Sequence, residues 1–416
     1  MIKGKRLLTA CIIGACVCLT SVAPAFAETE LNSGSEAVIK SNSEDAMLSA
    51  CLSHSPQEYD GQLALFCAEL CKAAEGESNE GIEKKLAASG FENDKTFDED
   101  SYNTKKTADD TAGYSFAQRR IFAQGRACNL VAVVVRGTFG GEWYGNFDIG
   151  DGSEARSDIG EILHSGFSKA ELELEKNLDA YMKSISCTKQ NTIILVTGHS
   201  RGAAVANILA YSLARHEKYA PQEVIYAYTF ACPNTVFTDA AGSGKPAAGI
   251  EKNCGNIFNI LNPSDFITYL PVRQWGACRF GRDYVLPPTD EEAYRASLAF
   301  EAEIARLASD KGQAYHKSLS GIAGTKITLY KYFYKVAGIL AGNENPVAVL
   351  PYAAGDTAGL TEFLAANAVE SGRVVQTHGI GGYIKALAGK TEKTFLENAA
   401  SFVPEERGGF ADDNYA

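Results

Sequence analysis

The pentapeptide Gly-His-Ser-Arg-Gly at residues 198–202 constrains the fold of this chain more than any other segment. It follows the apolar run 193–196 and precedes the alanine-rich run 203–206, which is typical of a sharp turn from a buried strand into a helix. Such a turn strains the serine backbone, and it brings strand and helix so close that a Cβ at either glycine would clash. We therefore expect Ser200 to stand exposed at the edge of a sheet.

Predicted strands and helices alternate along the chain on both sides of this turn. Strands are predicted at 114–122, 130–135, 192–196, 224–230 and 256–261, and the first two are joined by a hairpin connection at 123–129. Helices are predicted at 59–71, 81–88, 203–216 and 291–307, and another is expected to begin at Ser168, with Glu171 completing a capping box. This alternation predicts an α/β fold, with a mostly parallel, doubly wound sheet, helices on both faces and a helical insertion.

The N-terminus has the three parts of a secretory signal peptide, with cleavage predicted after Ala27. Residues 1–6 carry three cations, residues 7–22 are uncharged and mostly apolar, and Ala-Phe-Ala precedes a polar segment. A membrane anchor and a lipid anchor at Cys16 are the weaker alternatives, and no later segment predicts a membrane span. We therefore expect a mature protein that is secreted or lies on the extracellular surface.

Composition divides the rest of the chain into further parts. Residues 28–55 are polar and rich in serine, glutamate and alanine, and we expect a mobile leader there. The others are an N-terminal helical extension at 56–112, the core with the sharp turn at 113–289, a helical insertion at 290–345 that would form a cap or lid, and a C-terminal part at 346–416 that returns to the core and ends in a frayed tail. The length suits one large α/β domain with extensions.

The charge of the chain argues against nucleic acid as a partner. The formal net charge is -12, and loss of residues 1–27 would remove three cations and no acidic residue. Such a surface repels nucleic acid and anionic membranes, and no tract rich in lysine and arginine offsets it. The sequence gives no indication of the oligomeric state.

Eight of the eleven cysteines follow the predicted cleavage site. An even number permits disulfides in an exported chain, and Cys254 and Cys278, on either side of a predicted strand, are the preferred pair. Cys67 and Cys71 lie four residues apart on one face of a predicted helix. Since no histidine or further cysteine lies at ligand spacing, we expect buried thiols there and not a metal site.

A serine hydroxyl is a weak nucleophile, so Ser200 needs a base, an acid that orients the base, and donors for an oxyanion. Where such a serine lies on a strand-turn-helix, the acid and then the histidine follow later in the chain. Asp265, at the end of a predicted strand, is the best acid, and Asp239 and Asp283 are weaker alternatives.

Three histidines follow Ser200 in the sequence. His216 lies at the end of the helix that starts beside Ser200 and is expected to point away from it. His378 lies in a glycine-flanked loop that can approach a sheet edge, whereas His316 lies in a charged helical stretch, where a solvated histidine is ordinary. His378 and His316 both remain candidates for the base on this reasoning, with His378 favoured.

Several short motifs between about residues 114 and 387 have a pattern in common with one family. They are Arg136-Gly137-Thr138, Trp143-Tyr144-Gly145-Asn146, His164-Ser165-Gly166-Phe167, the pentapeptide at 198–202, Asn262-Pro263-Ser264-Asp265 and the segment 378–383. Together these motifs resemble the class 3 lipases, the fungal-type triacylglycerol lipase group within the α/β-hydrolases, and exported bacterial lipase-like proteins.

The resemblance implies a serine ester hydrolase, either a lipase or a carboxylesterase, that forms an acyl-enzyme on lipid or other carboxylic esters. It implies no metal and no organic cofactor. The roles that it implies are Ser200 as nucleophile, His378 as base, Asp265 as orienting acid, Thr138 and Arg201 as oxyanion hole through their backbone N–H groups, with the Thr138 hydroxyl as a further donor, and Trp143 as a lid residue unless it belongs to the core. His164 is expected to be structural and hydrogen-bonded near the sheet.

Three departures from the family pattern leave the substrate open, one of which is the Gly140-Gly141 pair, which predicts a short and flexible lid. Arg201 stands where an apolar residue is common, which predicts a polar mouth and suits short soluble esters as well as lipids. The interval of 113 residues from Asp265 to His378 leaves room for a cap. The alternatives are a serine peptidase of the same fold and a non-catalytic surface binding protein, in which His378 or Asp265 would lie out of reach of Ser200.

Overall fold

The computed structural model describes residues 44–93, 100–103, 107–108, 110–143, 145–148, 156–185, 187–237, 254–271, 273, 277–309, 376–388 and 405–407. The expected signal peptide lies outside the described residues, as do Asp239, His316 and the part of the insertion beyond residue 309. Within the described ranges, none of the helices combines the length and the apolar character that a bilayer crossing requires.

The centre of the molecule is a mixed, mostly parallel sheet with the strand order β1-β2-β3-β5-β6-β8-β10-β11. The strands are β1 Glu92–Asn93, β2 Tyr114–Ala123, β3 Arg126–Val135, β5 Thr192–His199, β6 Ile225–Phe230, β8 Ile257–Leu261, β10 Arg282–Val285 and β11 Glu405–Arg407. The five strands from β3 to β10 are parallel to their neighbours, and β1, β2 and β11 pair antiparallel at the two edges. The predicted parallel, doubly wound sheet is confirmed.

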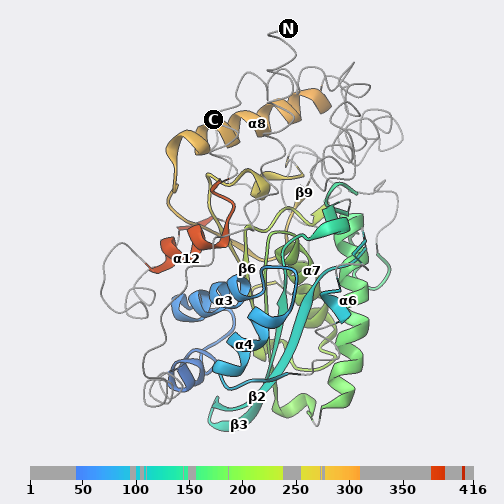
Figure 1. Cartoon of the computed structure of the whole chain (residues 1–416), viewed down its shortest axis with the longest axis vertical. Coiled ribbons are helices and arrows are strands. Elements are labelled where there is room, and N and C mark those ends of the chain that lie inside the picture. Colours follow the sequence, from blue (N-terminus) through green and yellow to red (C-terminus); the bar gives the residue numbers. More distant parts are fainter. Residues whose placement is uncertain are drawn as a thin grey trace.

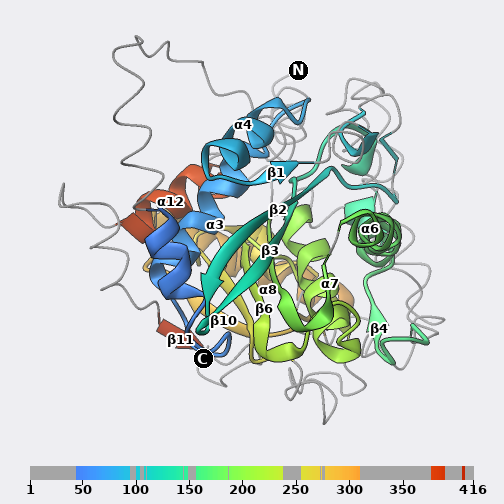
Figure 2. The same ribbon diagram turned by 90° about the horizontal axis from the view of Figure 1, so that it is seen from below.

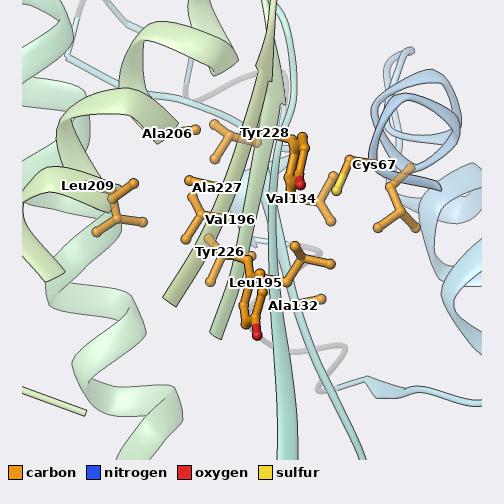
Figure 3. Packing of buried hydrophobic residues seen from close by; sticks show 14 of the residues in the cluster. Cys67, Ala132, Val134, Leu195, Val196, Ala206, Leu209, Tyr226, Ala227 and Tyr228 are labelled. Atoms are coloured by element: carbon orange, nitrogen blue, oxygen red, sulfur yellow. The ribbon is translucent and has the colours of Figure 1, made fainter. Parts of the chain in front are cut away.

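Helices cover both faces of this sheet (Figures 1 and 2). One face carries α3 Gly61–Ala73 and α12 Ile380–Ala388, with α4 Glu80–Ala88 beside α3, and the other carries α6 Ser165–Ser184 and α7 Arg201–His216. In Figure 3, Cys67 of α3 and Leu209 of α7 point toward opposite faces of the same strands. Each sheet face therefore buries its apolar side chains against a helix.

The central strands are apolar on both faces because they are covered on both sides. All eight residues of β5 and all six of β6 are buried, which is the pattern expected of strands in a doubly covered parallel sheet. Residues 201–214 of α7 are buried around the whole helix, and their many alanines let α7 lie close to β5. The strand that carries the sharp turn is thus enclosed on both faces.

The hairpin between β2 and β3 is tighter than the sequence predicts. The connection expected at 123–129 is reduced to Gln124 and Gly125, with φ of 53° and 74°, and Ala123 pairs with Arg126. Two successive positive φ values are what a two-residue hairpin turn requires, and glycine provides the second without strain.

Residues 44–55 differ from the expected mobile leader. Residues 44–51 are helical, and Leu48 and Leu52 are fully buried in the core. The apolar residues recur at helical spacing, but they are set in a sequence rich in serine and glutamate that conceals the pattern. Residues 28–43 lie outside the described residues.

The expected capping box at Ser168 is wrong. Helix α6 begins at Ser165 with His164 as its N-cap, so Ser168 and Glu171 lie within the helix and are buried. Glu171 forms an ion pair with Arg156, which comes from outside the helix. The partner of Glu171 is therefore a tertiary contact that local sequence does not reveal.

The preferred disulfide between Cys254 and Cys278 is also wrong, because Cys278 is a free thiol. Cys278 belongs to β9 Ala277–Cys278, in a small antiparallel sheet with β7 Val236–Phe237 and β4 Ile162–Leu163. Cys67 and Cys71 are buried thiols on α3, as expected.

The described start of the insertion packs close to the end of β8. Helix α8 Glu291–Ser309 begins after Asp290, and Ser297 Oγ donates to the carbonyl oxygen of Ser264 at 3.1 Å. The Ser264 hydroxyl in turn donates to the Asp290 carbonyl oxygen at 2.8 Å. Residues 290–309 are thus tied to the loop that contains Asp265.

Candidate active site

Ser200 lies between β5 and α7 in a strained backbone conformation, with φ of 58° and ψ of -126°. A Cβ added to Gly198 would lie 2.3 Å from the Gly202 carbonyl oxygen, and one added to Gly202 would lie 2.3 Å from the Val135 carbonyl oxygen. Both distances are far below contact, so the expected clash is confirmed. Strand β3, β5 and α7 can approach this closely only because both side chains are missing.

Ser200 is 8% exposed, which corrects the expectation that it stands exposed. Its Oγ lies 2.8 Å from His378 Nε2. His378 comes from the turn that leads into α12, on the sheet face opposite α7. Two segments 178 residues apart thus meet at this serine.

Asp265 lies on the other side of the His378 ring. His378 Nδ1 is 2.9 Å from Asp265 Oδ2 and 3.0 Å from Oδ1. A carboxylate only accepts, so it selects the tautomer with the proton on Nδ1. The lone pair of Nε2 then faces Ser200 Oγ and is ready to accept its proton.

The carboxylate of Asp265 is fully buried and receives several hydrogen bonds. The Tyr383 hydroxyl donates to Oδ2 at 2.7 Å, and the Ile267 backbone N–H donates to Oδ1 at 3.0 Å. A buried carboxylate is tolerated only when donors compensate for lost water. Tyr383 is a site residue that sequence reasoning missed, although its position five residues after His378 placed it in the same motif.

Side chains tie the loop of Asp265 to the loop of His378. Asn262 Nδ2 donates to the Thr377 carbonyl oxygen at 3.2 Å, and Thr377 Oγ1 donates to the Ser264 carbonyl oxygen at 2.7 Å. These residues directly precede or closely flank Asp265 and His378. The distance between acid and base is therefore set by hydrogen bonds between the two loops.

His199 is a second residue that sequence reasoning did not assign to the site. Its Nε2 lies 2.8 Å from the backbone carbonyl oxygen of His378. Burial, together with the neighbouring His378, lowers the pKa of His199 to about 3, so the ring is neutral and its Nε2–H donates. His199 thus holds the main chain of His378 beside Ser200.

The segment that contains Thr138 passes directly over the sharp turn. A Cβ added to Gly137 would lie 3.8 Å from Ser200 Cβ. Thr138 follows, and its Oγ1 accepts a hydrogen bond from Asn146 Nδ2 at 2.9 Å. Arg201 follows Ser200 and is the first residue of α7, where backbone N–H groups are not used within the helix.

The Arg201 side chain does not make the mouth of the site polar. It is 1% exposed and turns inward, where Nη2 donates to the carbonyl oxygens of Thr111 at 2.9 Å and Gly166 at 3.3 Å. Nη1 donates to Asn146 Oδ1 at 3.1 Å. The expectation of a polar mouth was wrong because the acceptors of the Arg201 guanidinium come from segments that are distant in the sequence.

His164 is buried, as a structural residue should be, and its backbone N–H donates to the Thr235 carbonyl oxygen at 2.9 Å, but its ring is not hydrogen-bonded as expected. Its ring stacks on Phe167 with centroids 3.8 Å apart, and neither ring nitrogen makes a hydrogen bond with a described residue. Burial lowers its pKa to about 3.

Trp143 is the last residue of the 3₁₀ turn Gly140–Trp143. Its side chain lies outside the described part of the chain, and the lid role therefore stays a prediction.

The rival acid Asp283 is placed away from the histidine. It lies on β10, where it pairs with Arg279 at 3.3 Å and accepts a hydrogen bond from Asn259 at 3.1 Å. In a non-catalytic scaffold, His378 or Asp265 would lie out of reach of Ser200. Here His378 lies 2.8 Å from Ser200 Oγ and 2.9 Å from Asp265 Oδ2.

In the described ranges, no three histidine, cysteine or acidic side chains group in a way that could hold a metal ion.

Residues 132–275 match the family model of the class 3 lipases. This match confirms the resemblance, and the segment is class 3 lipase-like, with the fold of the α/β-hydrolases. No curated protein sequence matches the chain.

The solved structures that are similar to the chain include three lipases. A triacylglycerol lipase with a serine protease triad is 19% identical, over 55% of this chain and 78% of that one, with a TM-score of 0.38. The triacylglyceride lipase of Rhizomucor miehei is 17% identical, over 54% and 78%, with a TM-score of 0.36. The mono- and diacylglycerol lipase of Aspergillus oryzae is 17% identical, over 55% and 78%, with a TM-score of 0.35.

Proposed function

We propose that this protein is an exported serine ester hydrolase that cleaves lipid or other carboxylic esters through an acyl-enzyme. The observation that carries the proposal is the continuous hydrogen-bonded chain from Ser200 Oγ through His378 to the Asp265 carboxylate, with distances of 2.8 and 2.9 Å. A nucleophile, a base and an orienting acid in this order are the groups that acyl transfer needs.

In the first half of the reaction, Ser200 Oγ attacks the ester carbonyl carbon while its proton moves to His378 Nε2. The imidazolium that forms is stabilised by Asp265, which stays ionised. The tetrahedral intermediate collapses, His378 gives the proton to the departing alcohol, and the acyl group remains on Ser200. Water, deprotonated by His378, then attacks the acyl-enzyme and releases the carboxylic acid.

The negative oxygen of the tetrahedral intermediate needs donors that are in place before the reaction. The backbone N–H groups of Thr138 and Arg201 flank Ser200 and are the proposed donors, together with the Thr138 hydroxyl. Each such donor is worth about 3–4 kcal/mol of transition-state stabilisation in comparable sites.

Hydrolysis of p-nitrophenyl esters by the wild type and by Ser200→Ala tests this proposal. We expect a burst of nitrophenol equal to the enzyme concentration, followed by steady turnover, and neither in the variant. A folded Ser200→Ala protein that retains full esterase activity would refute the assignment of the nucleophile.

The ester class follows from the family match, and lipid esters are the proposed substrates. The burial of Arg201 supports an apolar mouth, because its charge is turned away from solvent. Activity that rises sharply when triacylglycerol forms an emulsion would support a lipase. Saturable hydrolysis of soluble short-chain esters, without this rise, would instead indicate a carboxylesterase.

Export is proposed on the N-terminal pattern of cations, apolar stretch and Ala-Phe-Ala. N-terminal sequencing of protein recovered from the medium or the cell surface tests it. Glu28 as the first residue is the expected result, whereas an intact Met1 on cytoplasmic protein would contradict it.

A further inference from the structure

The buried side chain of Arg201 is joined to the proposed oxyanion hole by a short chain of hydrogen bonds. Arg201 Nη1 donates to Asn146 Oδ1 at 3.1 Å, and Asn146 Nδ2 donates to Thr138 Oγ1 at 2.9 Å. None of the proposed chemical steps uses the guanidinium. These three side chains, which we call the Arg201 relay, nevertheless link the residue after the nucleophile to the residue that would hold the oxyanion.

The chemistry of the three groups fixes the direction of each hydrogen bond in the relay. A guanidinium can only donate, so Asn146 turns its carbonyl oxygen toward Arg201 and its amino group toward Thr138. The amino group can only donate, so Thr138 Oγ1 is the acceptor. The hydrogen of the Thr138 hydroxyl is then free for a further partner, and among the described residues none accepts it.

Thr138 follows a residue that lies close to the nucleophile. Gly137 approaches Ser200 so closely that its missing Cβ would be 3.8 Å from Ser200 Cβ, and Thr138 is the next residue. If the Asn146 amide were reversed, its carbonyl oxygen would attract the Thr138 hydrogen and remove it from the site. The orientation of one amide therefore decides whether the hydroxyl is a donor to the oxyanion.

The guanidinium is itself held in one plane by the main chain. Nη2 and Nε both donate to the Thr111 carbonyl oxygen, at 2.9 and 3.2 Å, and Nη2 also donates to the Gly166 carbonyl oxygen at 3.3 Å. The planar fork of arginine serves these acceptors and Asn146 together, which a lysine ammonium cannot do from one position.

We propose that Arg201 is a positioning residue, which locks Asn146 in the one orientation that leaves the Thr138 hydroxyl free to donate to the oxyanion. This inference rests on the proposed ester hydrolase. Loss of a whole oxyanion donor costs about 10²–10³-fold in kcat. Without Arg201 the hydroxyl keeps part of its favourable orientation, so we expect a smaller loss, of about tenfold.

The test is a double-mutant cycle on esterase activity, with kcat counted per serine titrated by a fluorophosphonate. Arg201→Leu and Asn146→Leu are each made alone and in a Thr138→Val background. We expect each to lower kcat about tenfold in the parent and to leave KM within about twofold, because an oxyanion donor acts on the transition state. In the Thr138→Val background neither should lower kcat further. Arg201→Lys, which can still donate to Asn146, should recover part of the loss.

Titration of active sites keeps the test valid if Arg201→Leu folds poorly, since only assembled sites are counted. Arg119→Leu is the matched control, because Arg119 is also buried and donates to the Ser89 carbonyl oxygen and Asp45, far from Ser200. It should lower stability and keep kcat per titrated serine.

An equal loss of kcat in both Thr138 backgrounds would overturn the relay and leave Arg201 a purely structural residue, as would full kcat in Arg201→Leu. These results would leave the ester hydrolase itself intact, because the wild type would still be titrated and active. A folded wild type that neither reacts with the fluorophosphonate nor cleaves esters would overturn the proposed function and the relay together.

Discussion

Ser200 is enclosed by two regions that are built in different ways. The first, the elbow side, consists of β3, β5 and the start of α7, and it is shaped by main-chain atoms packed where Gly198 and Gly202 have no Cβ. The second, the acid–base side, consists of the loops of Asp265 and His378, which are joined by side-chain hydrogen bonds. On the elbow side, a single added Cβ would disrupt the backbone packing as a whole. On the acid–base side, the hydrogen-bond network can lose one member and keep the others.

The largest effect is expected on the elbow side, from Gly202→Ala. The new methyl group would lie 2.3 Å from the Val135 carbonyl oxygen and 2.5 Å from that of Arg136, and neither main-chain atom can move away cheaply. We expect a loss of at least about 3 kcal/mol in the free energy of unfolding, or no folded protein.

Urea unfolding of Gly202→Ala and Gly381→Ala gives the comparison. Gly381 lies in α12, and an added Cβ there meets nothing within 4 Å, so alanine should raise stability by about 0.5–1 kcal/mol. Equal stability of the two variants would mean that the elbow is not defined by backbone contact.

On the acid–base side the largest effect is expected from Asp265→Asn. The amide would present a donor or a single acceptor to His378 Nδ1 and would favour the wrong tautomer, so kcat should fall about 10³–10⁴-fold. Stopped-time ester assays at a fixed number of titratable serines measure this. Asp283→Asn is the matched control, because Asp283 lies on β10, the strand next to β8, where it is half-buried and bound to Arg279. A similar fall in both variants would contradict the assignment of the acid.

A smaller effect is expected from Tyr383→Phe, which removes one donor from the Asp265 carboxylate and leaves those of Ile267 and His378. A hydrogen bond to a charged group is worth about 1.5–3 kcal/mol, so stability should fall by an amount of that order. The decrease in kcat should be about tenfold or less, since His378 keeps its acid. Loss of all activity in a folded Tyr383→Phe protein would show that the hydrogen-bond network cannot lose one member and still function.

The smallest effect, when it is counted per pH unit, is the change in stability with pH that His164 and His199 cause. Burial lowers the pKa of both to about 3 in the folded state, against 6.5 in the unfolded chain. The unfolded chain therefore binds more protons between these values, and the neutral rings contribute stability that is fully present above pH 6.5 and is lost as the pH falls toward 3. The slope is up to about 1.4 kcal/mol per pH unit for each histidine.

His164→Phe isolates the contribution of one histidine to this slope, because the ring stacks on Phe167 and makes no hydrogen bond with a described residue, and phenylalanine preserves its shape. Thermal unfolding between pH 7 and pH 4 should show a shallower decline in this variant, and higher stability at pH 4. The same substitution at the exposed His54 is the control for the loss of a histidine. An unchanged slope in His164→Phe would mean that the ring is protonated in the fold.

Sequence alone predicts the elbow side well, because all its determinants are local. A β-branched strand, two glycines and a run of alanines lie within a few residues of Ser200, and each imposes its geometry directly on the backbone. The strands β3, β5, β6 and β8 could be predicted for the same reason, since burial on both faces makes them continuous apolar runs.

Sequence predicts the acid–base side only in part. The order of Ser200, Asp265 and His378 follows from the resemblance, but the roles of Tyr383 and His199 depend on contacts across 118 and 179 residues. The inward turn of Arg201 fails to be predicted for the same reason, because its acceptor at Thr111 is 90 residues away. Side-chain direction is a tertiary property, and no local pattern encodes it.

Reaction with a fluorophosphonate is the most direct test of whether the two sides together activate Ser200. The wild type, Ser200→Ala and His378→Ala are compared at equal concentrations of folded protein, and the modified peptide is mapped by mass spectrometry. Fast labelling of the wild type at Ser200, at least about 10³-fold slower labelling of His378→Ala, and no labelling of Ser200→Ala is the predicted result. No reaction of the folded wild type, or a label that persists in Ser200→Ala, would contradict the account.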